Sequence, residues 1–207
     1  MISQWLQALH LKRQPPPEEF AHMFAADPDG EYVALDTETT SLDTKTAEII
    51  AIGAVRIQGK RILTSDSLDL LVKPSGIMAE ASIKTHHLRV RDLSGGMEPS
   101  AAIRRLLHFI GGRTLVGYYL EFDITLLNRY VQGLYGFTLP NTCVEVSAIY
   151  HKKKLGMFPH KNLDLRFETI RHDLGIPPLG EHNALNDALM TAMIFVKLQN
   201  LDRLPPT

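Results

Sequence analysis

Two acidic residues follow an apolar run in the first quarter of the chain. Tyr32-Val33-Ala34-Leu35 leads directly into Asp36, and Glu38 follows after one threonine. If the run is a buried strand, side chains two positions apart point the same way, so both carboxylates face one space. Like charges held this close repel each other, and a hard divalent cation with oxygen ligands removes the repulsion. The pair therefore predicts a metal site, and the alternative is a solvated acidic loop.

Two further acidic residues stand near predicted helix starts. Asp123 lies where a strand pattern gives way to an amphipathic helix, and Asp187 lies one turn into the last predicted helix. His182 comes five residues before Asp187, and its unperturbed pKa of about 6.5 suits a general base. The structural alternatives are that Asp123 is an N-cap, which accepts hydrogen bonds from free backbone amides, and that His182 is a solvated loop histidine.

The order Asp-x-Glu, then Asp, then His-x4-Asp resembles the DEDD exonucleases with histidine in the third motif, the DnaQ-like family. The runs Tyr32 to Asp43 and Ala47 to Val55 also resemble the first motif and second strand of that family. The resemblance covers about Glu31 to Leu198. It departs at two positions, because the family commonly has Asn where this chain has Tyr119 and Gly where it has Ser41.

The resemblance implies a metal-dependent 3′→5′ exonuclease that removes nucleotides one at a time. Asp36, Glu38, Asp123 and Asp187 would hold two divalent cations, Mg²⁺ or Mn²⁺, and His182 would take the proton of the attacking water. Residues around these motifs are implied as substrate contacts: Thr39, Thr40, Leu42, His86, His87 and Tyr119.

The sequence leaves the substrate open. The implied partners are nucleic acid 3′ ends, and the form Asp-Thr-Glu-Thr-Thr of the first motif favours DNA, single-stranded or frayed. An exoribonuclease that trims RNA 3′ ends would use the same side chains. The non-enzymatic alternative is a silent module that binds nucleic-acid ends or scaffolds a polymerase, and the intact set of acids and histidine argues against it.

Further contacts with macromolecules are predicted from two segments. A basic stretch before the third motif, Lys152 to Lys154 with Lys161, Arg166 and Arg171, is a candidate phosphate contact or else a solvated face. Gln7 to Leu11 loosely resembles the peptide that docks on the sliding clamp, which makes the clamp or a DNA polymerase a candidate partner. The chain ends at Pro205-Pro206-Thr207 without a polymerase tether, so the sequence leaves open whether it acts alone or with a polymerase.

A sheet and several helices are needed to bring these side chains together. Strands are predicted at 32–35, 49–57, within 61–73 and at 114–118, and helices over 103–110, 124–134 and 183–198, with the chain after Pro140 helical. This order predicts an α/β fold. The resemblance implies a ribonuclease H-like fold with a central mixed five-stranded sheet flanked by helices. Residues 1–30 are predicted to form an N-terminal helical arm and residues 31–207 the exonuclease domain.

Composition restricts the remaining choices. The chain has 207 residues, 44% of them hydrophobic, enough for one buried core. Its formal charge of −1 means that nucleic acid must be bound by a local patch. Cys143 is the only cysteine, which excludes an internal disulfide and a cysteine zinc cluster. The single cysteine fits a reducing compartment, so we expect a cytoplasmic protein. No apolar run approaches the roughly 18 residues that span a membrane, so we expect no membrane partner.

Overall fold

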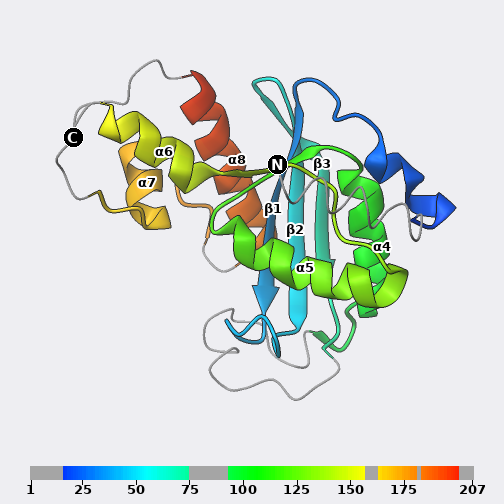
Figure 1. Cartoon of the computed structure of the whole chain (residues 1–207). Coiled ribbons are helices and arrows are strands. Elements are labelled where there is room, and N and C mark those ends of the chain that lie inside the picture. The colour runs from blue at the N-terminus through cyan, green and yellow to red at the C-terminus, as the bar shows by residue number, and fades with distance from the viewer. Residues whose placement is uncertain (1–15, 75–92, 157–162, 181–182, 201–207) are drawn as a thin grey trace.

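One mixed sheet with helices on both faces makes up the computed structural model (Figure 1). This layered arrangement confirms the predicted α/β class. Within the described part of the chain, no helix has the length and apolar character needed to cross a bilayer. The described residues are 16–74, 93–156, 163–180 and 183–200.

The sheet has five strands, as the resemblance implied, and their order is β3-β2-β1-β4-β5. β1 (Glu31–Thr39) pairs antiparallel with β2 (Ile49–Gln58), which pairs antiparallel with β3 (Arg61–Leu71). On the other side, β4 (Thr114–Gly117) and β5 (Cys143–Glu145) run parallel to β1. Strands β2 and β3 are added on one side of β1 and strands β4 and β5 on the other, so the strand order reverses at β1. Ligand sites of open α/β sheets form at such a switch point, beyond the carboxyl ends of the parallel strands.

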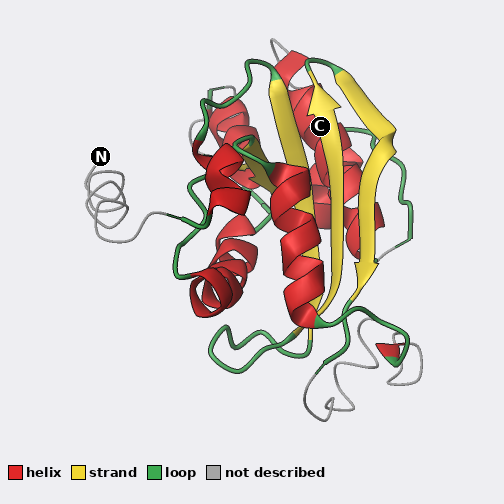
Figure 2. Cartoon of the chain, turned by 90° about the vertical axis from the view of Figure 1, so that its right-hand side faces the viewer, coloured by secondary structure: helices red, strands yellow, loops and turns green. Residues whose placement is uncertain are grey.

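Two groups of helices cover the two faces of the sheet (Figures 1 and 2). One face is packed by the 3₁₀ helix η1 (Glu18–Phe24), α4 (Pro99–Ile110) and α5 (Leu120–Tyr135). The other face is packed by α6 (Val146–Leu155), α7 (Phe167–Asp173) and α8 (Ala184–Asn200). Because the helices lie on opposite sides, a site at the end of β1 receives side chains from both layers.

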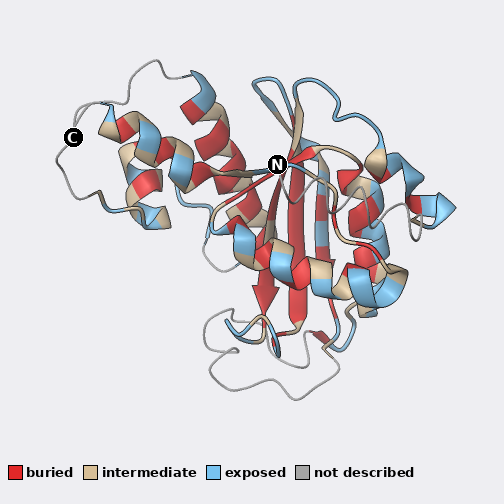
Figure 3. Ribbon diagram, in the orientation of Figure 1, coloured by how far each residue is buried: buried red, intermediate tan, exposed pale blue. Residues whose placement is uncertain are grey.

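Burial on both faces explains why β1 begins as a continuous apolar run. Val33 and Leu35 pack in the core with α4 and α5, while Ala34 between them packs in the core with α8. β1 and β2 are accordingly buried along most of their length (Figure 3). β3 lies at the edge of the sheet and alternates, with Leu68 and Leu70 buried and their neighbours more exposed.

Two details differ from the elements predicted from sequence. β1 continues through Asp36 and Glu38 to Thr39, so the acids lie within the strand and not after its end. The chain after Pro140 is not wholly helical, because Cys143–Glu145 forms the edge strand β5. A strand of three residues is too short to show a period of two, which is why the pattern missed it.

Candidate active site

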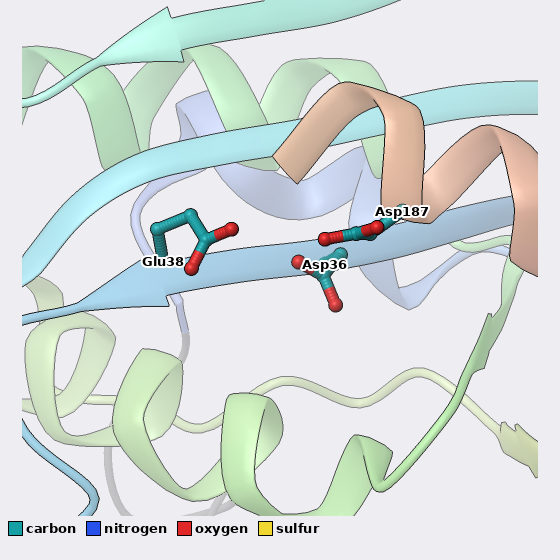
Figure 4. A group of neighbouring side chains, drawn as sticks. All are labelled: Asp36, Glu38 and Asp187. Atoms are coloured by element: carbon teal, nitrogen blue, oxygen red, sulfur yellow. The ribbon is translucent and has the colours of Figure 1, made fainter. Parts of the chain in front are cut away.

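Three carboxylates from two distant segments meet at the end of β1 (Figure 4). Asp36 and Glu38 project from β1 on the face of Ala34, which is the face that α8 covers. Asp187 projects toward them from the first turn of α8. One oxygen of each of the three carboxylates lies within 4.8 Å of the others. The three side chains thus lie together, and their role as metal ligands stays a prediction.

A glycine lets α8 approach the sheet closely enough to deliver Asp187. Gly53 of β2 is the register partner of Asp36. A Cβ added at Gly53 would lie 2.0 Å from the carbonyl carbon of Ala184 and 2.2 Å from the amide nitrogen of Leu185, so the two backbones are in direct contact. Asn183 starts the helix as predicted, since its Oδ1 accepts a hydrogen bond of 3.0 Å from the Asn186 amide.

Asp123 reaches the same end of β1 from the opposite layer. It is buried in the first turns of α5, and its Oδ1 accepts hydrogen bonds from the Thr37 amide at 3.0 Å and the Thr37 hydroxyl at 2.5 Å. The alternative that Asp123 is the N-cap is wrong, because α5 begins three residues earlier, at Leu120. The Leu120 amide donates instead to Glu145 Oε2 at 3.0 Å.

Without a bound cation, the ionised forms of these buried carboxylates are destabilised by desolvation and by repulsion from one another. Burial raises the pKa of Asp36 well above its ordinary range, and Asp123, Asp187 and Glu38 raise it further. Burial also raises the pKa of Asp123 to about 7, although both hydrogen bonds from Thr37 act in the opposite direction. Acids this close are not all ionised at neutral pH without a counter-charge. A set of hard oxygen donors with this charge fits a divalent cation.

Comparison with known proteins decides the family. A family model described as Exonuclease matches residues 33–195, more than half of the chain. The chain belongs to the exonuclease family. Members of this family depend on divalent metal, and the carboxylate cluster is present where such a metal would bind.

Relatives by sequence include subunits of bacterial DNA polymerases. DNA polymerase III subunit epsilon of Aquifex aeolicus is 29% identical over 170 residues, which are 82% of this chain and 81% of that protein. DNA polymerase III PolC-type of Thermotoga maritima is 30% identical over 169 residues, which are 82% of this chain but 12% of that protein. These matches confirm the predicted 3′→5′ exonuclease of the DnaQ-like proofreading family.

Solved structures share the fold at low sequence identity. Escherichia coli Exonuclease I in complex with a dA16 oligonucleotide has a TM-score of 0.72 and 12% identity, over 84% of this chain and 42% of that one. Cell-death related nuclease 4 has a TM-score of 0.69 and 16% identity, over 84% of this chain and 65% of that one. The exonuclease thus spans less than half the length of Exonuclease I. The ribonuclease H-like fold implied by the sequence is confirmed.

The other predicted site residues of the exonuclease fall into two groups. Thr39 and Thr40 shape the turn after β1, since the Thr39 hydroxyl donates to the Ser41 carbonyl at 2.8 Å and the Thr40 hydroxyl accepts from the Glu48 amide at 2.9 Å. Leu42 and Tyr119 instead expose 85% and 67% of their surface. Substrate contacts at these four residues stay predictions. His86, His87 and His182 lie outside the described residues.

Tyr119 has an unusual backbone conformation. With φ 54° and ψ 34°, it is the only residue other than glycine with positive φ in the described part of the chain. This left-handed conformation costs a bulky residue roughly 1–2 kcal/mol, whereas Asn adopts it more easily. The conformation would suit Asn, the residue that the resemblance led us to expect here, and this chain adopts it with an aromatic side chain.

Part of the basic stretch has a structural role. Lys154 is buried and forms an ion pair of 2.9 Å with Asp173, which ties α6 to α7. Arg166 and Arg171 form ion pairs with acids on their own segment, Asp164 and Glu168. Lys161 lies outside the described residues. Three members of the basic stretch, Lys154, Arg166 and Arg171, are thus paired with acids. A phosphate would have to compete with these acids for them.

Sequence reasoning missed two residues that build the site. Thr37 holds Asp123, and Gly53 admits α8. Thr37 gave no signal, because a threonine between two acids on a strand points to the face opposite them. Gly53 did carry one, since an isolated glycine inside an apolar strand indicates a close approach of another backbone.

Proposed function

We propose that this exonuclease hydrolyses phosphodiester bonds at the 3′ end of single-stranded or frayed DNA and releases nucleoside monophosphates one at a time. The observation that carries the proposal is the convergence of Asp36, Glu38 and Asp187 within 4.8 Å at the carboxyl end of β1. DNA is supported by the names of the relatives, which are DNA polymerase subunits, and by the DNA oligonucleotide bound to Exonuclease I, which has the same fold.

We propose that Asp36, Glu38, Asp123 and Asp187 hold two divalent cations, Mg²⁺ or Mn²⁺. Cations bound there would offset the charge of the phosphate and lower the pKa of a water molecule. The chain itself contributes fixed ligand positions. The two hydrogen bonds from Thr37 hold the Asp123 carboxylate in place before substrate arrives, so no ordering cost is added at that moment. Without cations, four clustered acids repel a phosphate.

His182 is proposed as the general base that takes the proton of the attacking water. An imidazole with a pKa near 6.5 is largely neutral at working pH and can accept that proton. Its position in the sequence supports the role, because it directly precedes Asn183, which caps the helix that carries Asp187.

Digestion of labelled strands tests the proposal. We expect a ladder of single-nucleotide steps from 5′-labelled single-stranded DNA with Mg²⁺ or Mn²⁺, and none in EDTA. Asp36→Asn should lower kcat/KM by at least ~10²-fold, because several kcal/mol of charge stabilisation depend on the bound cation. Asp29→Asn, at an exposed turn carboxylate, is the matched control and should retain activity.

Two outcomes of this experiment contradict the proposal. Cleavage that is undiminished in EDTA or in Asp36→Asn would remove the carboxylate cluster from the mechanism. Faster cleavage of RNA than of DNA of the same sequence would replace the DNA substrate with RNA 3′ ends while leaving the site assignment in place. His182→Ala should cost about 10²–10⁴ in rate, the usual contribution of a general base.

Two broader proposals rest on the relatives alone. Since these include bacterial DNA polymerase subunits, we propose a cytoplasmic location and association with a DNA polymerase or its sliding clamp. The predicted clamp peptide, Gln7 to Leu11, lies outside the described residues. A pull-down with the clamp that is unaffected by deleting residues 1–13 would remove that peptide from consideration.

A further inference from the structure

An apolar cavity opens between the start of α5 and strand β5, beyond the end of β4. Its volume is about 520 Å³, within the range of roughly 300–1,000 Å³ usual for small-molecule sites. Tyr119, Leu120 and Ile124 from the start of α5 line one side, and Cys143 and Leu165 line another. Ile124 directly follows Asp123, so the cavity begins next to a proposed metal ligand.

Tyr119 presents an aromatic ring at this cavity. The ring is 67% exposed, and it lies nearly parallel to the ring of Phe122, with centroids 6.3 Å apart and planes inclined by 14°. Tyr119 is the N-cap residue of α5, but its side chain makes no capping hydrogen bond, and the Leu120 amide donates to Glu145 instead. A strained, exposed aromatic residue at the edge of a catalytic site is a candidate for ligand contact.

The charge of the cavity lining favours a nucleobase over a phosphate group. Its lining includes two acids, Glu121 and Glu145, and no lysine or arginine among the described lining residues. A phosphate would be repelled there, whereas an uncharged base would stack on the ring and bury apolar surface. Tyr119 lies one helical turn before Asp123, about 6 Å along the axis, a distance that one or two stacked nucleotides of about 3.4 Å each would span.

We infer that the cavity beside Tyr119 receives one nucleobase of the substrate strand and that the Tyr119 ring is the surface on which this base stacks. The inference rests on the proposed function. Stacking on an aromatic ring does not read the identity of the base, so the subsite contributes affinity for a single strand without sequence preference. It also favours strands whose bases are unpaired, because a paired base cannot enter the cavity.

Single abasic nucleotides locate the contact. In 5′-labelled DNA with one abasic position, counted from the 3′ end, we expect one position at which the missing base raises the wild-type KM about 5–150-fold. Tyr119→Ala should raise the KM of the intact strand by a similar factor, more than it changes kcat. In that variant the abasic substitution at the same position should have no further effect, since ring and base contribute only together.

Matched variants separate stacking from folding. Tyr119→Phe keeps the ring and should restore the sensitivity to the abasic position. Tyr119→Asn removes the ring but suits the left-handed backbone, so its Tm should be no lower than that of the wild type while its KM rises as in Tyr119→Ala. Leu134→Ala, at an exposed position near the other end of α5, should leave KM unchanged.

Two results would overturn the inference, and they are distinguishable. If the wild type cleaves DNA but Tyr119→Ala and Tyr119→Asn keep its KM within about twofold, the stacking site is wrong and the proposed function stands. If the wild type cleaves neither DNA nor RNA with Mg²⁺ or Mn²⁺, the proposed function fails, and the inference fails with it.

Discussion

Thr37 stands between the two acidic residues of β1 and serves the opposite face of the strand. Pairing between β1 and β4 covers only Tyr32 to Ala34, so beyond that point the backbone of β1 lacks a strand neighbour on the β4 side. Asp123 supplies the missing acceptor by taking both the amide and the hydroxyl of Thr37. The end of the β1–β4 pairing thus creates the position that Asp123, a proposed metal ligand, occupies.

The Thr37 hydroxyl should therefore matter for catalysis. Thr37→Val keeps the shape and the amide hydrogen bond but removes one of the two donors to Asp123. We expect kcat/KM to fall about 10–100-fold, the usual cost of losing a group that orients a metal ligand. Thr37→Ser keeps a hydroxyl and should recover most of the rate. Equal kcat/KM in Thr37→Val and wild type would show that the amide alone positions Asp123.

Among single residues, the acids of the site can be predicted from sequence more readily than the residues that position them. Asp36, Glu38, Asp123 and Asp187 have side chains whose chemistry is specific to few roles, and their order matches one family. The roles of Thr37 and of Glu145, which accepts from Leu120 at one helix start and from Ser147 at another, depend on contacts between distant segments. Single residues carry no pattern from which such contacts follow.

Helix α8 and strand β2 touch through their backbones at Gly53. A side chain at this position would displace the first turn of α8 and with it Asp187. We expect Gly53→Ala to weaken Mn²⁺ binding about 10–100-fold, measured by isothermal titration, and to reduce activity in parallel. The added methyl group meets backbone atoms, which cannot move aside as a flexible side chain would.

The same substitution elsewhere provides the control for this prediction. Gly133 lies in α5, and a Cβ there would meet nothing within 4 Å. Gly133→Ala should raise stability by up to ~1 kcal/mol through helix propensity and leave Mn²⁺ affinity unchanged. If Gly53→Ala loses stability but binds Mn²⁺ as tightly as the wild type, the close contact supports only the fold and does not position Asp187.

Helices with a clear periodicity of apolar residues were predicted from sequence, whereas the strand that carries the site was predicted only in part. The amphipathic spacing of α4, α5 and α8 gave their positions. β1 was predicted too short, because Asp36, Thr37 and Glu38 interrupt the apolar run although the backbone continues to pair with β2 as far as Thr39. Polar residues at the site interrupt the apolar pattern of the strand, so the predicted strand ended at Leu35, before the site.

The whole molecule should be less stable at neutral pH than at mildly acidic pH when metal is absent. The pKa of Asp123 is about 7, against an ordinary value of 3.8, and the pKa of Asp36 is raised as well. Between the unfolded and folded values the folded state binds more protons, so stability falls as pH rises from about 4 to 7. In EDTA we expect Tm to drop across this interval, by about 2–4 °C for each kcal/mol lost.

Two comparisons test the origin of this drop. Asp36→Asn removes one of the repelling acids, so its Tm in EDTA should depend less on pH, and Asp29→Asn should behave as the wild type. Saturating Mn²⁺ should raise the Tm most at neutral pH, where the acids are ionised; a hundredfold excess over Kd corresponds to about 2.7 kcal/mol. A Tm in EDTA that rises through the interval would contradict the buried-acid explanation.

The site draws on both helical layers and on the helix that carries Asp187 near the far end of the described chain. During translation, a nascent polypeptide that has emerged only as far as α7 contains Asp36, Glu38 and Asp123 but lacks Asp187. Such a chain lacks one of the clustered acids. We therefore expect the nascent protein to bind no cation at this site until α8 has left the ribosome and packed against Gly53.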